Sequence, residues 1–212
     1  RARSRREMKH NIKWLFFDLG STLINEQLAY EHTFQDIAKQ VHKSYEEIYS
    51  EAVEFYTQNK KGNIELFIKY ELEKGKWYME DEIPYKAAEI CLQELGSKYH
   101  IGIIANQALG TKERLDKWGL LQYIDMVIAS AEEGISKPDL RIFQLALEQA
   151  GCNPNEAIMI GDRIDHDIIP AKKIGMSTIW VKQGMGSYWN ISKDDEKADL
   201  VVDHIQEILQ LL

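Results

Sequence analysis

The sequence predicts an α/β fold, in which a parallel β-sheet is flanked by helices and interrupted by a helical insertion. Short apolar runs alternate with amphipathic helical patterns over most of the 212 residues, and this alternation is typical of parallel strands joined by crossover helices. Residues 25–80 break the alternation, because they contain no apolar run of the buried-strand type. An apolar content of 44% is enough for a substantial core.

The first expected strand is the apolar run that ends at Asp18. Residues 12–17 are rich in Ile, Leu, Trp and Phe, and the turn residues Gly20, Ser21 and Thr22 follow. Such a run indicates a strand that is buried on both faces. Asp18 would then lie at the carboxyl end of the strand, where open α/β sheets bind ligands. An aspartate before a glycine turn also commonly begins a turn, so its position alone assigns no function.

The segment 25–80 predicts three helices. Ser44 and Glu47 have the spacing of a capping box for the second helix. We expect the aromatic residues of this segment to serve packing rather than a substrate pocket. The apolar positions with helical spacing are Phe34, Ile37, Ala38 and Val41, then Tyr45, Ile48, Tyr49 and Ala52, then Ile64, Phe67, Ile68 and Leu72.

From Pro84 onward, helices and strands alternate to the end of the sequence. Pro138 near the first turn of one expected helix and Gly151 after its end follow the usual asymmetry of helix termini. The expected helices are a helix from Ala87 that closes at Gly96, then 111–118, 138–150, a helix through Ile168 and Ile174, and a final helix from Ile205. The expected strands are 101–105, 125–129, 157–160, 178–181 and 200–202.

Polar residues follow the expected strands and should gather at one edge of the sheet. They are Asp18, Asn106, Lys137 and Asp162, with Asp165 and Asp167 close behind. Carboxylates from two strands, together with a lysine, suit a divalent cation and a phosphate. Taken singly, each has a structural alternative: a solvated lysine, a turn asparagine, or acidic residues in the first turn of a helix.

These polar residues resemble, in order and placement, the motifs of the haloacid dehalogenase-like hydrolase superfamily. The first motif is matched by Asp18-Leu19-Gly20-Ser21-Thr22, the second by Ala105-Asn106, the third by Lys137-Pro138, and the fourth by Gly161-Asp162 with Asp167. The resemblance covers residues 11–212. It implies a Rossmann-like core over 11–24 and 81–212 and an inserted α-helical cap over 25–80. Residues 1–10, which carry a basic cluster, are expected to form a flexible tail.

The resemblance also implies roles for the matching residues. Asp18 would attack phosphorus and form an aspartyl phosphate that water hydrolyses. Mg²⁺ would be held by the Asp18 carboxylate, the Gly20 carbonyl and the Asp162 carboxylate, and Asp167 is counted with this metal site. The remaining implied roles are charge neutralisation by Lys137, orientation of Lys137 or of a metal-bound water by Asp167, and a hydrogen bond from Asn106 to the phosphoryl group.

The sequence departs from the family pattern at two positions. Gly20 stands where phosphatases of the family usually carry a second aspartate, which protonates the leaving oxygen and later activates water. Such proton transfer contributes about 10² to 10⁴ in rate. Ala105 stands where a Ser or Thr usually donates to the phosphoryl group. Another residue, such as His32 or Glu31 of the cap, or substrate-assisted proton transfer, is a candidate replacement for the aspartate, although both side chains also suit an ordinary surface.

Three functions follow from these observations. The first is a Mg²⁺-dependent phosphatase of a small phosphorylated metabolite. The second is a weakened or inactive binding or regulatory protein on the same scaffold, which the residues Gly20 and Ala105 favour. The third is dehalogenation of a haloacid, in which the aspartate attacks carbon. Retention of Asp162 argues against the third, because a metal-binding carboxylate has no obvious task in that chemistry.

Charge and composition limit the partners. A net charge of −8 and a pI near 5.3 argue against a nucleic-acid surface. Cys91 and Cys152 are expected to be reduced packing residues of a cytoplasmic protein. No apolar segment has the length of a membrane span, so we expect no membrane partner. The partner is expected to be a small phosphorylated metabolite, and the protein a monomer or a homodimer.

Overall fold

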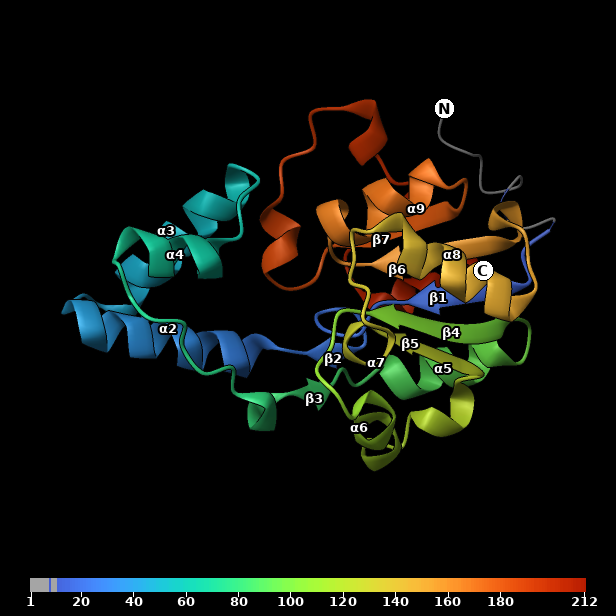
Figure 1. Ribbon diagram of the computed structural model, residues 1–212, viewed down its shortest axis with the longest axis horizontal. Helices are drawn as coiled ribbons and strands as arrows, with labels where there is room; N and C mark the ends of the chain where they lie inside the picture. Colours follow the sequence, from blue (N-terminus) through green and yellow to red (C-terminus); the bar gives the residue numbers. More distant parts are fainter. Residues whose placement is uncertain (1–7, 9–10) are drawn as a thin grey trace.

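The computed structural model describes residue 8 and residues 11–212, and it contains a six-stranded parallel sheet flanked by helices (Figure 1). The strands lie in the order β5-β4-β1-β6-β7-β8. This arrangement confirms the predicted α/β, Rossmann-like class. The strands are β1 (Trp14–Phe17), β4 (His100–Ala105), β5 (Met126–Ala129), β6 (Ala157–Gly161), β7 (Ser177–Val181) and β8 (Leu200–Val202).

Strand β1 lies inside the sheet, between β4 and β6, and is buried along its whole length. Trp14 and Phe16 pack into the core on one face, and Leu15 and Phe17 into the core on the other, because successive side chains of a strand point to opposite faces. This two-sided burial explains the uninterrupted apolar run. Helices α8 (Leu140–Ala150) and α9 (Ile169–Lys173) cover the first face, and α5 (Ala88–Gly96) and α10 (Ile208–Leu211) cover the second.

Three helices form the insertion, which lies to the left of the sheet in Figure 1. They are α2 (Gln27–Val41), α3 (Tyr45–Thr57) and α4 (Gly62–Lys69). They bury a core of their own that includes Phe34, Ile48 and Tyr56. The aromatic residues of this segment therefore serve packing as expected, but Tyr30 and Tyr56 also line a cavity, which was not expected. The Ser44 capping box, with Glu47 as its partner, is also confirmed.

A short antiparallel pair of strands connects the insertion to the sheet. Strand β2 (Ile24–Asn25) pairs with β3 (Ile83–Pro84), so the chain leaves and returns side by side. A division of the chain into domains at residues 25 and 80 stays a prediction. The tail expected over 1–10, with its basic cluster, falls outside the described residues except for Met8, which is buried in the core.

Several predicted helix ends were wrong. Pro84, from which the alternation was expected to start, lies in the unpredicted strand β3, and the helix expected from Ala87 begins at Ala88. Pro138 precedes α8 rather than occupying its first turn, because Asp139 is the N-cap and its side chain accepts from the Arg141 N–H. The helix expected through Ile168 is divided into a π-helical turn over Ile164–Ile168 and α9.

Two shorter helices complete this part of the chain. Helix α6 (Thr111–Lys117) agrees with the prediction, whereas α7 (Ser130–Glu133) was not predicted. Cys91 is buried, Cys152 is partly buried, and neither forms a disulfide. Among the residues that the structure describes, no helix combines the length and the apolar character that a membrane span requires.

Candidate active site

The sheet brings the predicted residues to its carboxyl edge. Asp18 follows β1 directly, and its backbone N–H donates to the Ile160 carbonyl of β6 at 2.9 Å. Asp162 follows β6, and Lys137 comes from the loop between α7 and α8. Asp18, Gly20, Asn106, Lys137 and Asp162 line one cavity. Parallel strands therefore place these side chains together although they lie far apart in the sequence.

A buried ion cluster forms the base of this cavity. The Lys137 ammonium donates to Asp18 Oδ1 at 2.9 Å and to Asp167 Oδ1 at 2.6 Å. The Lys137 side chain is 2% exposed and the Asp167 side chain is fully buried. Gly161 permits this arrangement, because a Cβ at that position would overlap the Asp167 carboxylate. Asp167 therefore fixes Lys137 against Asp18.

The ionisable groups of this cluster influence one another. Burial alone would raise the pKa of Asp18, but the Lys137 ammonium holds it below its usual value. Burial and the negative charges of Asp18 and Asp167 raise the pKa of Asp162 well above its usual value. Burial raises the pKa of Asp167 to about 7, although Lys137 opposes the shift. Without a cation the site therefore keeps Asp18 ionised and favours a proton on Asp162.

The same carboxylates suit a divalent cation. One oxygen each from Asp18, Asp162 and Asp167 lies within 4.8 Å of the others, and carboxylate oxygens are preferred ligands of Mg²⁺. Both Asp167 oxygens already accept hydrogen bonds, from Lys137 and from the Arg163 N–H. Asp162 accepts from Thr22 Oγ1 at 3.1 Å. The residues present therefore fit a cation, and Asp18 and Asp162 are the more available ligands.

Asn106 supports Lys137 through its side-chain amide. Its Nδ2 donates to the Lys137 carbonyl at 2.9 Å, and its Oδ1 accepts from the Lys137 N–H at 2.8 Å. This reciprocal pair fixes the lysine loop against the end of β4. A hydrogen bond from Asn106 to a phosphoryl group stays a prediction. Ala105, the last residue of β4, offers no hydroxyl.

The cavity also contains residues that the sequence analysis did not assign to the site. Tyr30 of α2 and Tyr56 of α3 show that the insertion covers the site. Apart from Ser21, which belongs to the first matched motif, no sequence motif marks these residues, so only their position in the fold reveals them. The further lining residues are Ser21, Glu26, Gln107, Arg163, His166, Met185 and Gly186.

Neither candidate replacement for the missing aspartate lines this cavity. His32 Nδ1 lies 3.0 Å from Asp81 Oδ2, and its ring stacks on Tyr78. Glu31 accepts from Gln27 Nε2 at 2.9 Å. The structure instead places the Glu26 side chain beside Gly20. The interpretation of His32 and Glu31 as ordinary helix-surface residues fits these contacts better.

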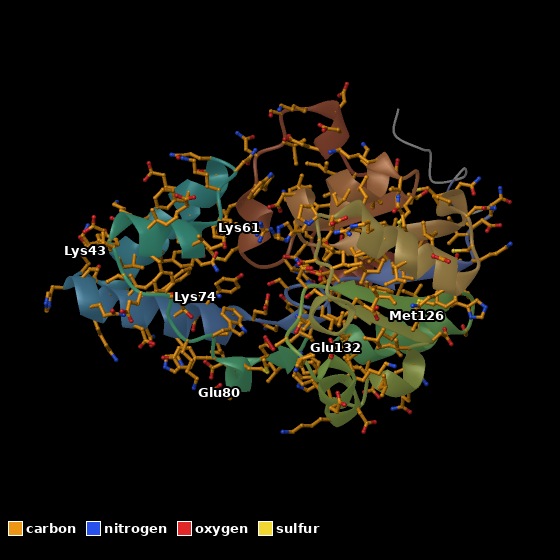
Figure 2. All side chains as sticks on the ribbon, viewed as in Figure 1. Lys43, Lys61, Lys74, Glu80, Met126 and Glu132 are labelled. Atoms are coloured by element: carbon orange, nitrogen blue, oxygen red, sulfur yellow. The ribbon has the colours of Figure 1, made fainter. Side chains whose placement is uncertain are left out.

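A cluster of nitrogen groups lies where the insertion meets the core. Lys61 Nζ lies 2.8 Å from His166 Nε2, and Figure 2 shows Lys61 on the side of the insertion that faces the core. Burial, together with the charges of Arg163 and Lys61, lowers the pKa of His166 to about 4, although Asp165 opposes the shift. The Arg163 guanidinium is paired with Asp165, at 3.0 and 2.8 Å. His166 is therefore neutral near pH 7.

Comparison with known proteins gives a consistent family. A family model described as haloacid dehalogenase-like hydrolase matches residues 15–181. A glyceraldehyde 3-phosphate phosphatase of Methanocaldococcus jannaschii is 35% identical over 47% of this chain and 42% of its own length. An enzyme of the same name from Pyrococcus abyssi is 30% identical over 82% of each chain. The chain therefore spans less than half of the first relative.

Solved structures agree with the fold. The crystal structure of a predicted phosphoglycolate phosphatase from Haemophilus somnus has a TM-score of 0.71 and 18% identity. The comparison covers 96% of this chain and 99% of the other. At this identity the similarity supports the fold alone.

Proposed function

The chain belongs to the haloacid dehalogenase-like hydrolase family, and from this premise we propose that it is a Mg²⁺-dependent phosphatase of small phosphorylated metabolites. The observation that carries the proposal is the Asp18 carboxylate, which the buried Lys137 ammonium contacts at 2.9 Å. Asp18 lies in a cavity that residues of α2 and α3 cover. An ionised carboxylate with a fixed cation beside it suits attack on a phosphate monoester.

In the proposed reaction, an Asp18 oxygen forms a bond to phosphorus while the bond from phosphorus to the leaving oxygen breaks. Water then forms a bond to phosphorus and releases phosphate from Asp18. Lys137 balances negative charge on the phosphoryl oxygens, while Asp167 and Asn106 keep it in place. Mg²⁺, which Asp18, Asp162 and the Gly20 carbonyl would hold, supplies further charge neutralisation when bound.

The residues that cover the cavity support a small substrate. Tyr30 and Tyr56 reach the cavity from the insertion, and Arg163 reaches it from the segment after β6. We therefore propose a small polar leaving group rather than a polymer. Dehalogenation is less well supported, because Asp162 and Asp18 form a paired carboxylate site that attack on carbon does not need.

The test is phosphate release from a panel of phosphorylated metabolites and from para-nitrophenyl phosphate, with and without Mg²⁺. We expect turnover that needs Mg²⁺ and that the Asp18→Asn variant lacks. If the wild-type protein releases no more phosphate than Asp18→Asn, even from the activated ester, the enzyme proposal is wrong. The binding or regulatory alternative would then be the better account of the site.

A further inference from the structure

Gly20 has no side chain that could donate a proton in the proposed reaction. The carboxylate of Glu26 occupies the space that a side chain at position 20 would take. A Cβ built on Gly20 would lie 2.6 Å from both carboxylate oxygens of Glu26 and 2.7 Å from Cδ. The Glu26 carboxyl group therefore lies against Gly20, where the side chain of any other residue would begin. Glu26 also lines the cavity that contains Asp18.

The helix that Glu26 begins does not use its side chain. Glu26 is the N-cap of α2, yet its carboxylate accepts no hydrogen bond from the first turn of the helix. The preceding residue takes part of that task, because Asn25 Oδ1 accepts from the Gln27 N–H at 2.9 Å. An N-cap carboxylate commonly accepts from backbone N–H groups of its own helix. The orientation of Glu26 toward Gly20 is therefore unusual for an N-cap residue.

A rigid turn holds Glu26 in this orientation. Ser21 Oγ donates to Glu26 Oε1 at 2.7 Å. Ser21 itself has φ of 58°, and its N–H donates to the Ile24 carbonyl at 2.7 Å. Gln183 Nε2 donates to the carbonyls of Ser21 and Thr22, both at 3.0 Å. The turn that holds Glu26 is thus fixed by a hydrogen bond within it and by two from Gln183.

We propose that Glu26 is the general acid and base of this site, acting from the start of α2 in place of a side chain at position 20. The inference rests on the proposed phosphatase function. In the first step the Glu26 carboxyl proton goes to the leaving oxygen as its bond to phosphorus breaks. In the second step Glu26 accepts a proton from the attacking water, whose oxygen bonds to phosphorus as the bond to Asp18 breaks. The proton count and the free Asp18 carboxylate are restored after each cycle.

The test compares two leaving groups in the Glu26→Gln variant. Phenyl phosphate needs a proton on its leaving oxygen, whereas para-nitrophenyl phosphate has a leaving group that departs unprotonated. We expect kcat/KM to fall by about 10² to 10⁴ for phenyl phosphate and by far less for para-nitrophenyl phosphate. We also expect a burst of nitrophenolate in the variant, because hydrolysis of the Asp18 phosphate would become the slow step. If Glu26 had a purely structural role, the variant would lose kcat/KM equally for both substrates and would show no burst.

A carboxylate swap provides a second, independent measurement. Glu26→Ser removes the carboxylate while keeping a favourable N-cap residue, and it opens space beside Gly20. The double variant Gly20→Asp with Glu26→Ser should have a kcat/KM for phenyl phosphate at least tenfold higher than that of Glu26→Ser alone. Glu46→Gln, which changes an exposed carboxylate of α3, is the matched control and should behave as the wild type.

The outcomes separate this inference from the proposed function. Turnover that Asp18→Asn abolishes, combined with equal losses on both esters in Glu26→Gln, would overturn the role of Glu26 alone. Failure of the swap to recover activity, in a double variant that unfolds at the wild-type temperature, would also count against it. Absence of any turnover that depends on Asp18 would overturn both proposals together.

Discussion

Lys137 is the residue whose removal should disturb the site most. Its ammonium contacts Asp18 and Asp167, and all three groups are buried. Lys137→Met would leave two carboxylates in the interior without their counter-charge, and breaking a buried pair in this way costs roughly 3 to 5 kcal/mol. We expect a loss of this size in urea unfolding without Mg²⁺, together with loss of phosphatase activity. Lys112→Met, at an exposed position of α6, is the control, and a loss below about 1 kcal/mol in Lys137→Met would contradict the account.

Glu26 should make the stability of the metal-free protein depend on pH. Burial, together with Glu82 and Asp18, raises its pKa to about 8, although Ser21 and Arg163 oppose the shift. Because the folded pKa lies above the unfolded value, this group favours folding below about pH 4.5, and the contribution is lost as the pH rises toward 8. In a chelator, Glu26→Gln should therefore gain stability relative to the wild type as the pH rises from 5 to 8. A difference between the two proteins that stays constant over this range would contradict the shift.

Site residues at the ends of buried strands could be predicted from the sequence, whereas a site residue that is positioned by a turn could not. Asp18 and Asp162 end strands that are buried on both faces, so their meeting at one edge of the sheet follows from strand order. Glu26 reaches Gly20 only because Ser21 adopts a positive φ and the turn reverses the chain. No periodic pattern encodes that turn. The candidate His32 does not line the site, because its ring stacks on Tyr78 and its Nδ1 lies 3.0 Å from Asp81 Oδ2.

Among the elements, the packing of α3 against α4 is the closest contact in the insertion that a substitution can test. A Cβ on Gly62, the first residue of α4, would overlap the Ala52 carbonyl oxygen and lie 2.8 Å from the Tyr56 ring. Gly62→Ala should therefore destabilise the protein by about 1 to 3 kcal/mol. Gly96→Ala is the matched control, because its Cβ would meet its neighbours at 3.7 Å or more. Equal losses of unfolding free energy in the two variants would contradict this, because they would show that α3 and α4 accommodate a methyl group at position 62 without strain.

Element boundaries were less predictable than the elements themselves. The strands could be predicted because burial on both faces requires continuous apolar runs, as in β4 and β6. The strand at Pro84, just before the helix expected through Ala87, was not predicted, because it forms only by pairing with Ile24. Pro138 was expected in the first turn of α8, but Asp139 caps the helix, so Pro138 lies just before it. A contact with a distant part of the chain decided the first case, whereas the second was decided by the local hydrogen bond between Asp139 and Arg141.

At the scale of the whole molecule, polar contacts join the insertion to the core around the site. Asn59 Nδ2 donates to the Asn190 carbonyl at 2.8 Å, and its Oδ1 accepts from the Asn190 N–H at 2.7 Å. The hydroxyls of Tyr49 and Tyr188 lie 3.0 Å apart. Apolar contacts join the two parts as well, because Met185 and Trp189 pack into the core of the insertion.

Binding of Mg²⁺ should stabilise the whole protein. A cation that binds only the folded state adds about 2.7 kcal/mol at a concentration of a hundred times its Kd. Because the pKa of Asp162 is raised by burial and by Asp18, binding should also release a proton and tighten as the pH rises. Thermal unfolding and calorimetry in buffers of different ionisation enthalpy measure the two effects. Asp162→Asn should lose both and Asp165→Asn neither, whereas equal stabilisation of all three proteins would place the cation elsewhere.

The most direct measurement is the location of the phosphoryl group during turnover. The protein is mixed with para-nitrophenyl phosphate and Mg²⁺, quenched in acid within one turnover, digested and analysed by mass spectrometry. The account predicts a phosphoryl group on Asp18 in the wild type, more of it in Glu26→Gln, and none in Asp18→Asn. Turnover without phosphorylated Asp18, or a phosphoryl group on a different residue, would contradict the proposal that Asp18 is the nucleophile.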